Sequence, residues 1–234
     1  KGAGFYHFGM GVETFANRLL HTNSLNKRAT NAEDADMVLT AQLAAKMSPS
    51  INIILFVPET TIEELFYVMK VTTYWIIKGC QVSVTPLLRP NPGTLIYDKI
   101  MSGESDVEII YSEWKNPYNN RIVKNPIYCK PKDEKLAQLI EKFKIREFQD
   151  MAKLSKPVYE RILKKVNWKS KIVPRPIQAL SVFITVSRLL ENQVGAKYFE
   201  KVAHNVLKRN NYKIDDKAIN AESYFLIHGI KGKI

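Results

Sequence analysis

Glu13 is the first residue of this chain whose type and position could support chemistry. It follows a short run that predicts a β-strand ending at Val12, and a helix is expected to begin near Thr14. In α/β folds ligands bind where parallel strands end. A carboxylate there can accept hydrogen bonds from hydroxyl groups or pair with an ammonium group. The alternative is that Glu13 lies in the first turn of the helix and only complements its dipole.

A proline-rich loop after a later strand is the second candidate site. The β-branched run Val82–Thr85 predicts a strand, and prolines then fix the backbone of its exit. Thr94 is placed to cap the helix that follows. Arg89 offers a guanidinium to an anionic group, unless it is only an exposed side chain in a purely structural turn. The residues of interest in this loop are Arg89, Pro90, Pro92 and Gly93.

A basic run between residues 161 and 171 is the third candidate site. Cations interleaved with an aromatic ring can hold a nucleic-acid backbone and stack a base. The alternative is a solvated helix face with a tryptophan packed in the core. The residues concerned are Lys164, Lys165, Trp168 and Lys169.

Other chemistries find no support in the sequence. The four histidines lie far apart and none has metal-ligand spacing, so no metal site is predicted. No Ser-His-Asp order, Walker loop or dinucleotide-binding glycine pattern is present, and no catalytic residue is assigned. Two cysteines, Cys80 and Cys129, do not make a disulfide framework, so a reducing cytoplasm is the expected location. No apolar run reaches the length of a membrane span.

The first hundred residues alternate between strands and helices. Asn31 is a plausible N-cap of the first long helix, which Ser48-Pro49-Ser50 is expected to end, and Gly79 is expected to end the second. Such alternation predicts a parallel sheet with right-handed crossovers, with Val12, Val57 and Thr85 near the carboxyl ends of neighbouring strands. The predicted elements are the helix Ala32–Met47, the strand Ile51–Val57, a helix from Thr60 or Thr61 to Lys78, and the strand Val82–Thr85.

The pattern changes after residue 103. Turn signals in residues 104–132 indicate a linker with a possible hairpin, in which Val107–Tyr111 could form a short strand. Helical spacing follows, and predicts helices at Val158–Val166, Ile177–Leu190 and Ala196–Leu207. Residues 133–234 carry 21 Lys/Arg and 11 Asp/Glu, whereas residues 1–132 carry 14 and 12. We therefore predict three parts: 1–103, the linker 104–132, and a basic helical domain 133–234.

Three segments of the first part, taken in order, resemble radical S-adenosylmethionine enzymes. Gly11-Val12-Glu13-Thr14, with Arg18-Leu19-Leu20 and Asn26-Lys27 after it, resembles the family's fourth strand and the helix and loop that follow. Ile53–Leu65, with Pro58-Glu59-Thr60, is similar to the fifth strand and its Gly-x-Pro-Gly-Glu-Thr loop. Thr85–Asp98 resembles the last barrel strand and its exit, where the family has prolines and Pro-Gly-Thr. The resemblance covers about residues 5–103.

The sequence departs from the family in two places. Val57 and Glu59 flank Pro58 directly, where the family has glycines. The Cys-x-x-x-Cys-x-x-Cys motif that holds the family's 4Fe-4S cluster is absent, and Cys80 and Cys129 cannot replace it. We therefore expect a missing N-terminal half, in the same polypeptide or on a separate chain, to supply the cluster.

The resemblance implies a fold, a function and cofactors. The expected fold is α/β: a partial (β/α) barrel of parallel strands, followed by a mainly α-helical domain. Glu13 would contact the ribose or amino group of S-adenosylmethionine, and the Arg89–Gly93 loop would lie near the adenine or the substrate. The implied chemistry is reductive cleavage of S-adenosylmethionine to a 5′-deoxyadenosyl radical. The layout is similar to the cobalamin-binding branch, which includes transferases, so cobalamin is a further expected cofactor.

A second hypothesis assigns the chain no catalysis. A half-barrel without its cluster could act as a structural or nucleic-acid-associated module, with the basic helical part contacting phosphates. A cysteine triad on a preceding segment or a partner chain would favour the enzyme, and its absence would favour the module.

Overall fold

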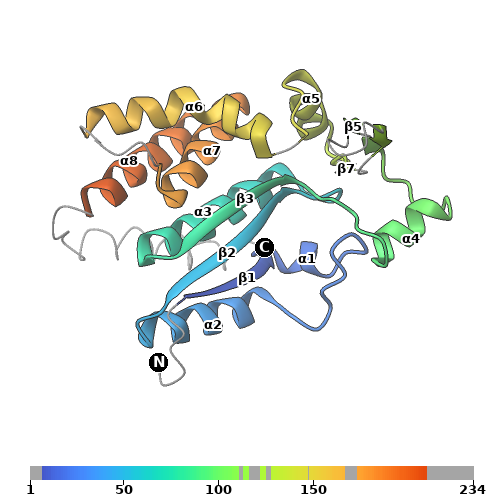
Figure 1. The fold of residues 1–234 in the computed structure, drawn as a ribbon, viewed down its shortest axis with the longest axis horizontal. Coiled ribbons are helices and arrows are strands. Elements are labelled where there is room, and N and C mark those ends of the chain that lie inside the picture. Colours follow the sequence, from blue (N-terminus) through green and yellow to red (C-terminus); the bar gives the residue numbers. More distant parts are fainter. Residues whose placement is uncertain are drawn as a thin grey trace.

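A parallel sheet of three strands forms the centre of the computed structural model, which describes residues 7–110, 113–115, 122–124, 128–146, 148–166 and 173–209. The strands lie in the order β1 (His7–Glu13), β2 (Ser48–Phe56) and β3 (Gln81–Leu87) (Figure 1). Val12 lies near the end of β1, Val57 directly follows β2, and Thr85 is two residues from the end of β3. The predicted parallel arrangement is confirmed.

Side chains alternate between the two faces of the central strand. On β2, Ile51, Ile53 and Leu55 are buried, whereas Asn52 and Ile54 between them are partly exposed. Asn52 pairs in register with Gly11 of β1 and with Ser83 of β3. The partly exposed face of the sheet therefore carries a polar residue at its centre.

Two capped helices make the crossovers between the strands. Helix α2 (Ala32–Ala44) begins with a capping box of Asn31 and Asp34, and α3 (Ile62–Lys78) with one of Thr61 and Glu64. In a capping box two backbone N–H groups find side-chain acceptors, which fixes the start of the helix. Helix α3 is followed by Gly79, whose φ of 104° is a left-handed conformation that glycine adopts without strain. The predicted cap at Asn31 is confirmed, and of the two residues considered for the second cap, Thr60 and Thr61, the cap is Thr61.

The boundary between α2 and β2 differs from the sequence prediction. Helix α2 ends at Ala44 instead of Met47, and β2 begins at Ser48, so Ser48-Pro49-Ser50 starts the strand and is not a connection. Pro49 fits because β2 pairs only with β1 there, and the pairing with β3 begins at Ser50. Proline is tolerated where a strand has an unpaired side.

Short elements follow the sheet. Helix α1 (Asn17–Leu20) follows β1, and α4 (Leu95–Met101) follows β3 with Thr94 as its N-cap, as predicted. In the linker, β4 (Ile109–Ile110) pairs antiparallel with β7 (Tyr128–Cys129), and β5 (Glu113–Lys115) pairs antiparallel with β6 (Ile122–Lys124). The residues that would connect β5 to β6 lie outside the described chain, so the hairpin expected there stays a prediction.

Four helices complete the described chain: α5 (Glu134–Lys142), α6 (Phe148–Lys165), α7 (Arg175–Leu189) and α8 (Gln193–Arg209). The predicted helix Val158–Val166 is only the second half of α6, which runs through Pro157. Helix α7 is buried along most of its length and packs against β3. Its Phe183 meets Phe199 of α8 in an edge-to-face contact, with 5.6 Å between ring centroids. Helix α8 also contacts α3, so one hydrophobic core joins sheet and helices. None of the described helices is long and apolar enough to cross a membrane.

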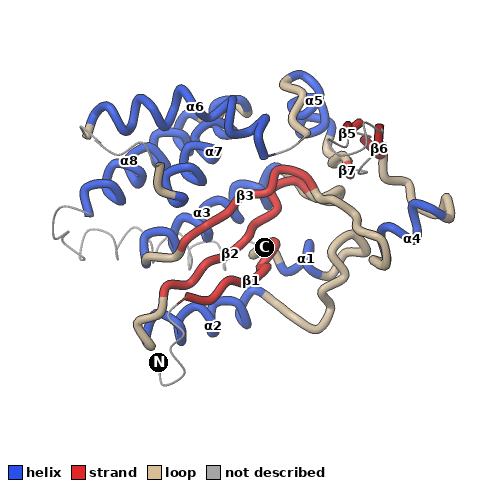
Figure 2. Tube along the Cα trace, in the orientation of Figure 1, coloured by secondary structure: helices blue, strands red, loops and turns tan. Residues whose placement is uncertain are grey.

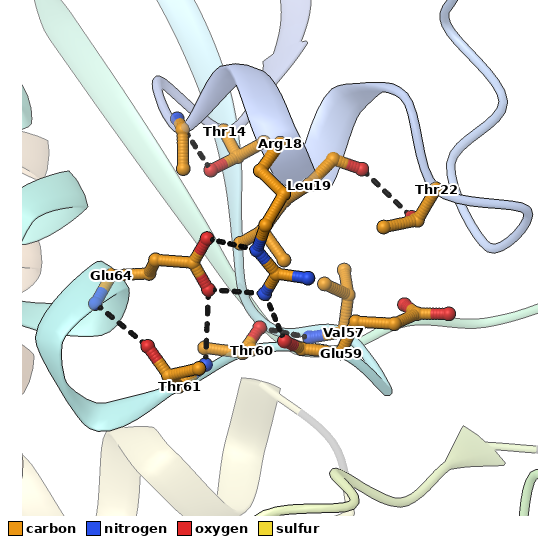
Figure 3. Close-up of polar contacts among 10 residues, drawn as sticks. Thr14, Arg18, Leu19, Thr22, Val57, Glu59, Thr60, Thr61 and Glu64 are labelled. Carbon is orange, nitrogen blue, oxygen red and sulfur yellow. Dashed lines mark hydrogen bonds and ion pairs between the residues drawn. The ribbon is translucent and has the colours of Figure 1, made fainter. Parts of the chain in front are cut away.

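Arg18 joins the exits of β1 and β2 (Figure 3). Its guanidinium donates two hydrogen bonds to the Glu64 carboxylate, at 2.7 Å from Nε and 2.6 Å from Nη2, and one to the backbone oxygen of Glu59 at 2.5 Å. This hydrogen-bonded carboxylate raises the pKa of Arg18 above its ordinary value. Glu64 also accepts from the Thr61 N–H, so one carboxylate serves both the helix cap and the Arg18 pair.

We expect Arg18→Ala to lower the free energy of unfolding by about 1 kcal/mol, because the pair has bidentate geometry but one partner is largely exposed. Guanidinium denaturation followed by circular dichroism measures this change. Arg28→Ala is the matched control, since Arg28 is exposed and makes only a 3.4 Å hydrogen bond to Asn23. A loss for Arg28→Ala equal to that for Arg18→Ala would contradict the role given to Arg18.

Candidate functional site

A cleft of about 460 Å³ lies at the carboxyl ends of the three strands. Its walls come from all three strands, from the loops after α1 and β3, and from the start of α4, which gather at the same end of the sheet (Figure 2). Parallel strands end on one side of a sheet, so this placement follows from the topology. Small-molecule sites commonly have volumes of about 300–1,000 Å³, which includes this cleft.

Four polar side chains form a connected chain across the floor of this cleft. Lys27 Nζ lies 3.3 Å from Glu13 Oε1 and donates to the Gly11 backbone oxygen at 2.8 Å. Asn52 Nδ2 donates to Glu13 Oε2 at 3.4 Å. Thr85 Oγ1 donates to Asn52 Oδ1 at 3.1 Å. Each strand contributes one member, so the Glu13 carboxylate is held from both sides.

The backbone at Glu13 is strained. Its φ of 65° lies in the left-handed region, which is unfavourable for a residue with a side chain, and the register with β2 shifts between Gly11 and Glu13. A Cβ added at Gly11 would collide with Glu13 Oε1. Glycine at position 11 therefore lets the carboxylate fold back over the strand. Strain of this kind, about 1–3 kcal/mol, persists where the surroundings enforce it and clusters at functional sites.

The alternative role for Glu13, as a partner of a helix dipole, is wrong. Helix α1 begins at Asn17, later than the sequence suggested, and has no acidic residue in its first turn. Instead, the buried Thr14 turns the chain, and its hydroxyl accepts a hydrogen bond from the Ala16 N–H at 3.2 Å. After β2, the Thr60 hydroxyl accepts a hydrogen bond from the Val57 N–H at 3.0 Å. A buried threonine hydroxyl therefore satisfies one backbone N–H at each of the two strand exits.

The loop after β3 makes the opposite wall of the cleft. Arg89, Pro90 and Gly93 line it, whereas Pro92 is exposed and does not. Gly93 has a φ of 84°, which requires glycine, and the Thr94 hydroxyl donates to the Asn91 backbone oxygen at 2.7 Å. Arg89 is exposed and has no ion pair or hydrogen bond within the described residues. It is therefore a free cation at the edge of the cleft, facing space that a ligand could fill.

Sequence reasoning missed three members of this site: Lys27, Asn52 and Thr85. Asn52 left a signal, because it is the one polar residue in the apolar run from Ile51 to Val57. Lys27 lay in a segment noted only for its family resemblance. Neither Asn52 nor Lys27 could be assigned a partner without knowing the register of β1 on β2.

The third candidate site lies only partly in the described chain. Lys164 and Lys165 are exposed near the end of α6, and Lys165 Nζ lies 3.5 Å from Glu200 Oε1. Trp168 and Lys169 fall outside the described residues, so their stacking and contact roles stay predictions.

The two cysteines do not suit an iron–sulfur cluster. Cys80 and Cys129 are both buried, in separate parts of the core. Burial raises the pKa of each thiol to about 12, and the Glu59 carboxylate adds to the effect at Cys129. A cluster needs thiolates, which these environments disfavour. Among the described residues no group of three or more His, Cys, Asp or Glu side chains could hold a metal ion.

Comparison of the chain with protein-family models, with curated proteins and with solved structures found no match.

We expect both thiols to resist dithionitrobenzoate at pH 8 in the folded protein and to react once guanidinium unfolds it. With a pKa of about 12 only about one thiol in ten thousand is ionised at pH 8. Because the folded pKa is raised, the thiols stabilise the fold fully below pH 9, and this contribution declines as pH rises toward 12. Cys80→Ala and Cys129→Ala should each flatten the alkaline loss of stability. Rapid labelling of the folded protein would contradict the prediction that both thiols are buried and protonated.

Proposed function

We propose that this chain forms the part of a radical S-adenosylmethionine enzyme that positions the cofactor and the substrate. One observation carries the proposal. Glu13 and the Arg89–Gly93 loop, assigned separately to the cofactor by resemblance, line one cleft at the carboxyl ends of parallel strands. The sheet would then be the carboxyl-terminal half of a (β/α) barrel.

The residues of the cleft fit S-adenosylmethionine in charge and hydrogen bonding. The Glu13 carboxylate can accept hydrogen bonds from ribose hydroxyls or from the amino group, while Lys27 and Asn52 hold its orientation. Arg89 can pair with a carboxylate of the cofactor or substrate. The backbone of Pro90–Gly93 can approach the adenine. When bound in such an enzyme, S-adenosylmethionine supplies the radical that abstracts hydrogen from the substrate, and this chain orients it and excludes water.

The 4Fe-4S cluster does not belong to the residues of this chain. Cys80 and Cys129 are buried and their thiols are held protonated. The proposal therefore assigns the cluster ligands to a further segment, in the same polypeptide or on a separate chain. Cobalamin, the other cofactor that the resemblance implies, stays a prediction.

We expect Glu13→Gln to weaken S-adenosylmethionine binding about 10- to 100-fold, because a hydrogen bond to a charged group contributes about 1.5–3 kcal/mol. Ligand-detected NMR titration of S-adenosylmethionine into the 234-residue chain suits weak binding and measures this ratio. Glu63→Gln is the control, since Glu63 is an exposed carboxylate in the first turn of α3. Absence of binding by the wild type, or equal affinities for all three proteins, would contradict the proposal.

We expect Gly11→Ala to weaken binding while leaving the fold largely intact. The added methyl group must displace the Glu13 carboxylate, which is the far end of a flexible side chain. Gly9→Ala is the matched control on the same strand, because its nearest neighbour would be the Ser50 backbone oxygen at 3.9 Å. Thermal melting checks the fold, and the same titration checks the affinity. If both variants bind as the wild type does, the position of Glu13 does not matter.

A further inference from the structure

Three basic side chains from two helices converge on one carboxylate of a third. Glu200 of α8 lies 2.9 Å from Arg188 of α7, and 3.2 Å and 3.5 Å from Arg161 and Lys165 of α6. These four residues are called the Glu200 cluster below. Three cations and one anion leave it with two unbalanced positive charges. The cations stay reachable, with side-chain exposures of 44% for Arg161, 56% for Lys165 and 33% for Arg188.

Two further exposed cations lie close in sequence to members of the Glu200 cluster. Lys164 is exposed beside Lys165, and Lys197 is exposed one turn before Glu200 on α8. Neither has an ion pair within the described residues. Residues 148–209 contain 13 Lys/Arg and only 4 Asp/Glu. Of these acids, Glu160 lies 3.8 Å from Lys156, and Glu200 is already shared by three cations. This segment of the sequence therefore carries more basic than acidic residues.

We propose that the surface formed by the Glu200 cluster with Lys164 and Lys197 binds the phosphate backbone of a nucleic acid. Clustered Lys and Arg displace the counterions condensed on such a backbone, which makes binding favourable at low salt. Arginine also matches the geometry of phosphate oxygens. Backbone contacts of this kind are independent of base sequence. The inference does not rely on the cleft at the sheet or on the function proposed for it.

An anionic membrane is the less suitable partner. Membrane surfaces hold amphipathic helices through buried apolar side chains as well as through charge. Among the large apolar residues that the structure describes as exposed, only Val194 lies on α6, α7 or α8. The charged surface therefore lacks the apolar face that would enter the lipid.

The first test measures binding of a fluorescein-labelled oligouridylate of about 20 nucleotides by anisotropy, over a series of salt concentrations. Lys164→Glu/Lys197→Glu should lower the slope of log K against log salt by about 1.4, and the affinity roughly 25-fold at about 0.1 M salt, for two lost contacts. Lys46→Glu/Lys135→Glu carries the same change in net charge at exposed lysines elsewhere and should have a much smaller effect. Equal losses in both variants would overturn the proposal.

Glu200→Gln gives a test with the opposite sign. It removes the carboxylate that competes with phosphate, so oligouridylate should bind about fivefold more tightly at about 0.1 M salt. If the cluster only fastens α6, α7 and α8 together, the variant should instead melt at a lower temperature and bind no better. Repeating the anisotropy measurement with a labelled DNA duplex shows whether the surface prefers a single-stranded or a double-stranded nucleic acid. Sedimentation with phosphatidylserine vesicles, without binding to either oligonucleotide, would assign the surface to membranes and overturn the proposal.

Discussion

Parallel pairing of β1, β2 and β3 is the constraint on which the site depends. Two parallel neighbouring strands need a crossover connection between them. Helices α2 and α3 therefore return the chain to the end of the sheet at which every strand begins. All three exits then meet at one end of the sheet. Arg18 fastens the first exit to the second by binding both the Glu64 carboxylate and the Glu59 backbone. The cleft exists because three segments far apart in sequence are forced to end together.

The strain at Glu13 makes sense within that arrangement. The left-handed backbone conformation of Glu13 costs stability. Its carboxylate does not lie in the first turn of a helix, so no helix dipole compensates for this cost. The carboxylate is held by Lys27 on one oxygen and Asn52 on the other, and Gly11 leaves the room that it needs. The arrangement thus holds one carboxylate in the cleft from two sides, on a backbone conformation that itself costs about 1–3 kcal/mol.

The parts that could be predicted from the sequence are those with local causes. The caps Asn31 and Thr94 were identified, and the third cap was narrowed to Thr60 or Thr61, because each capping hydrogen bond closes within three residues. The start of β2 was misplaced because Pro49 reads as a break locally, and only its position beside an unpaired edge permits a strand. The helix predicted at Val158–Val166 begins ten residues too late, because α6 starts at Phe148 and continues through Pro157. Glu13 and the Arg89 loop were found from motif position, whereas Asn52 needed the register between strands, which no local pattern encodes.

The two edges of the sheet differ in a way that bears on the proposed barrel. Helix α7 packs against β3, and four consecutive β3 residues from Val82 to Thr85 line a cavity of about 350 Å³ against it. On β1, by contrast, His7, Phe8, Gly9 and Gly11 are exposed, and β1 pairs with β2 alone among the described strands. An exposed strand edge with a phenylalanine beside it favours pairing with a further strand. In the proposed barrel, additional strands would therefore join at β1, which places them next to Glu13 and on the open side of the cleft.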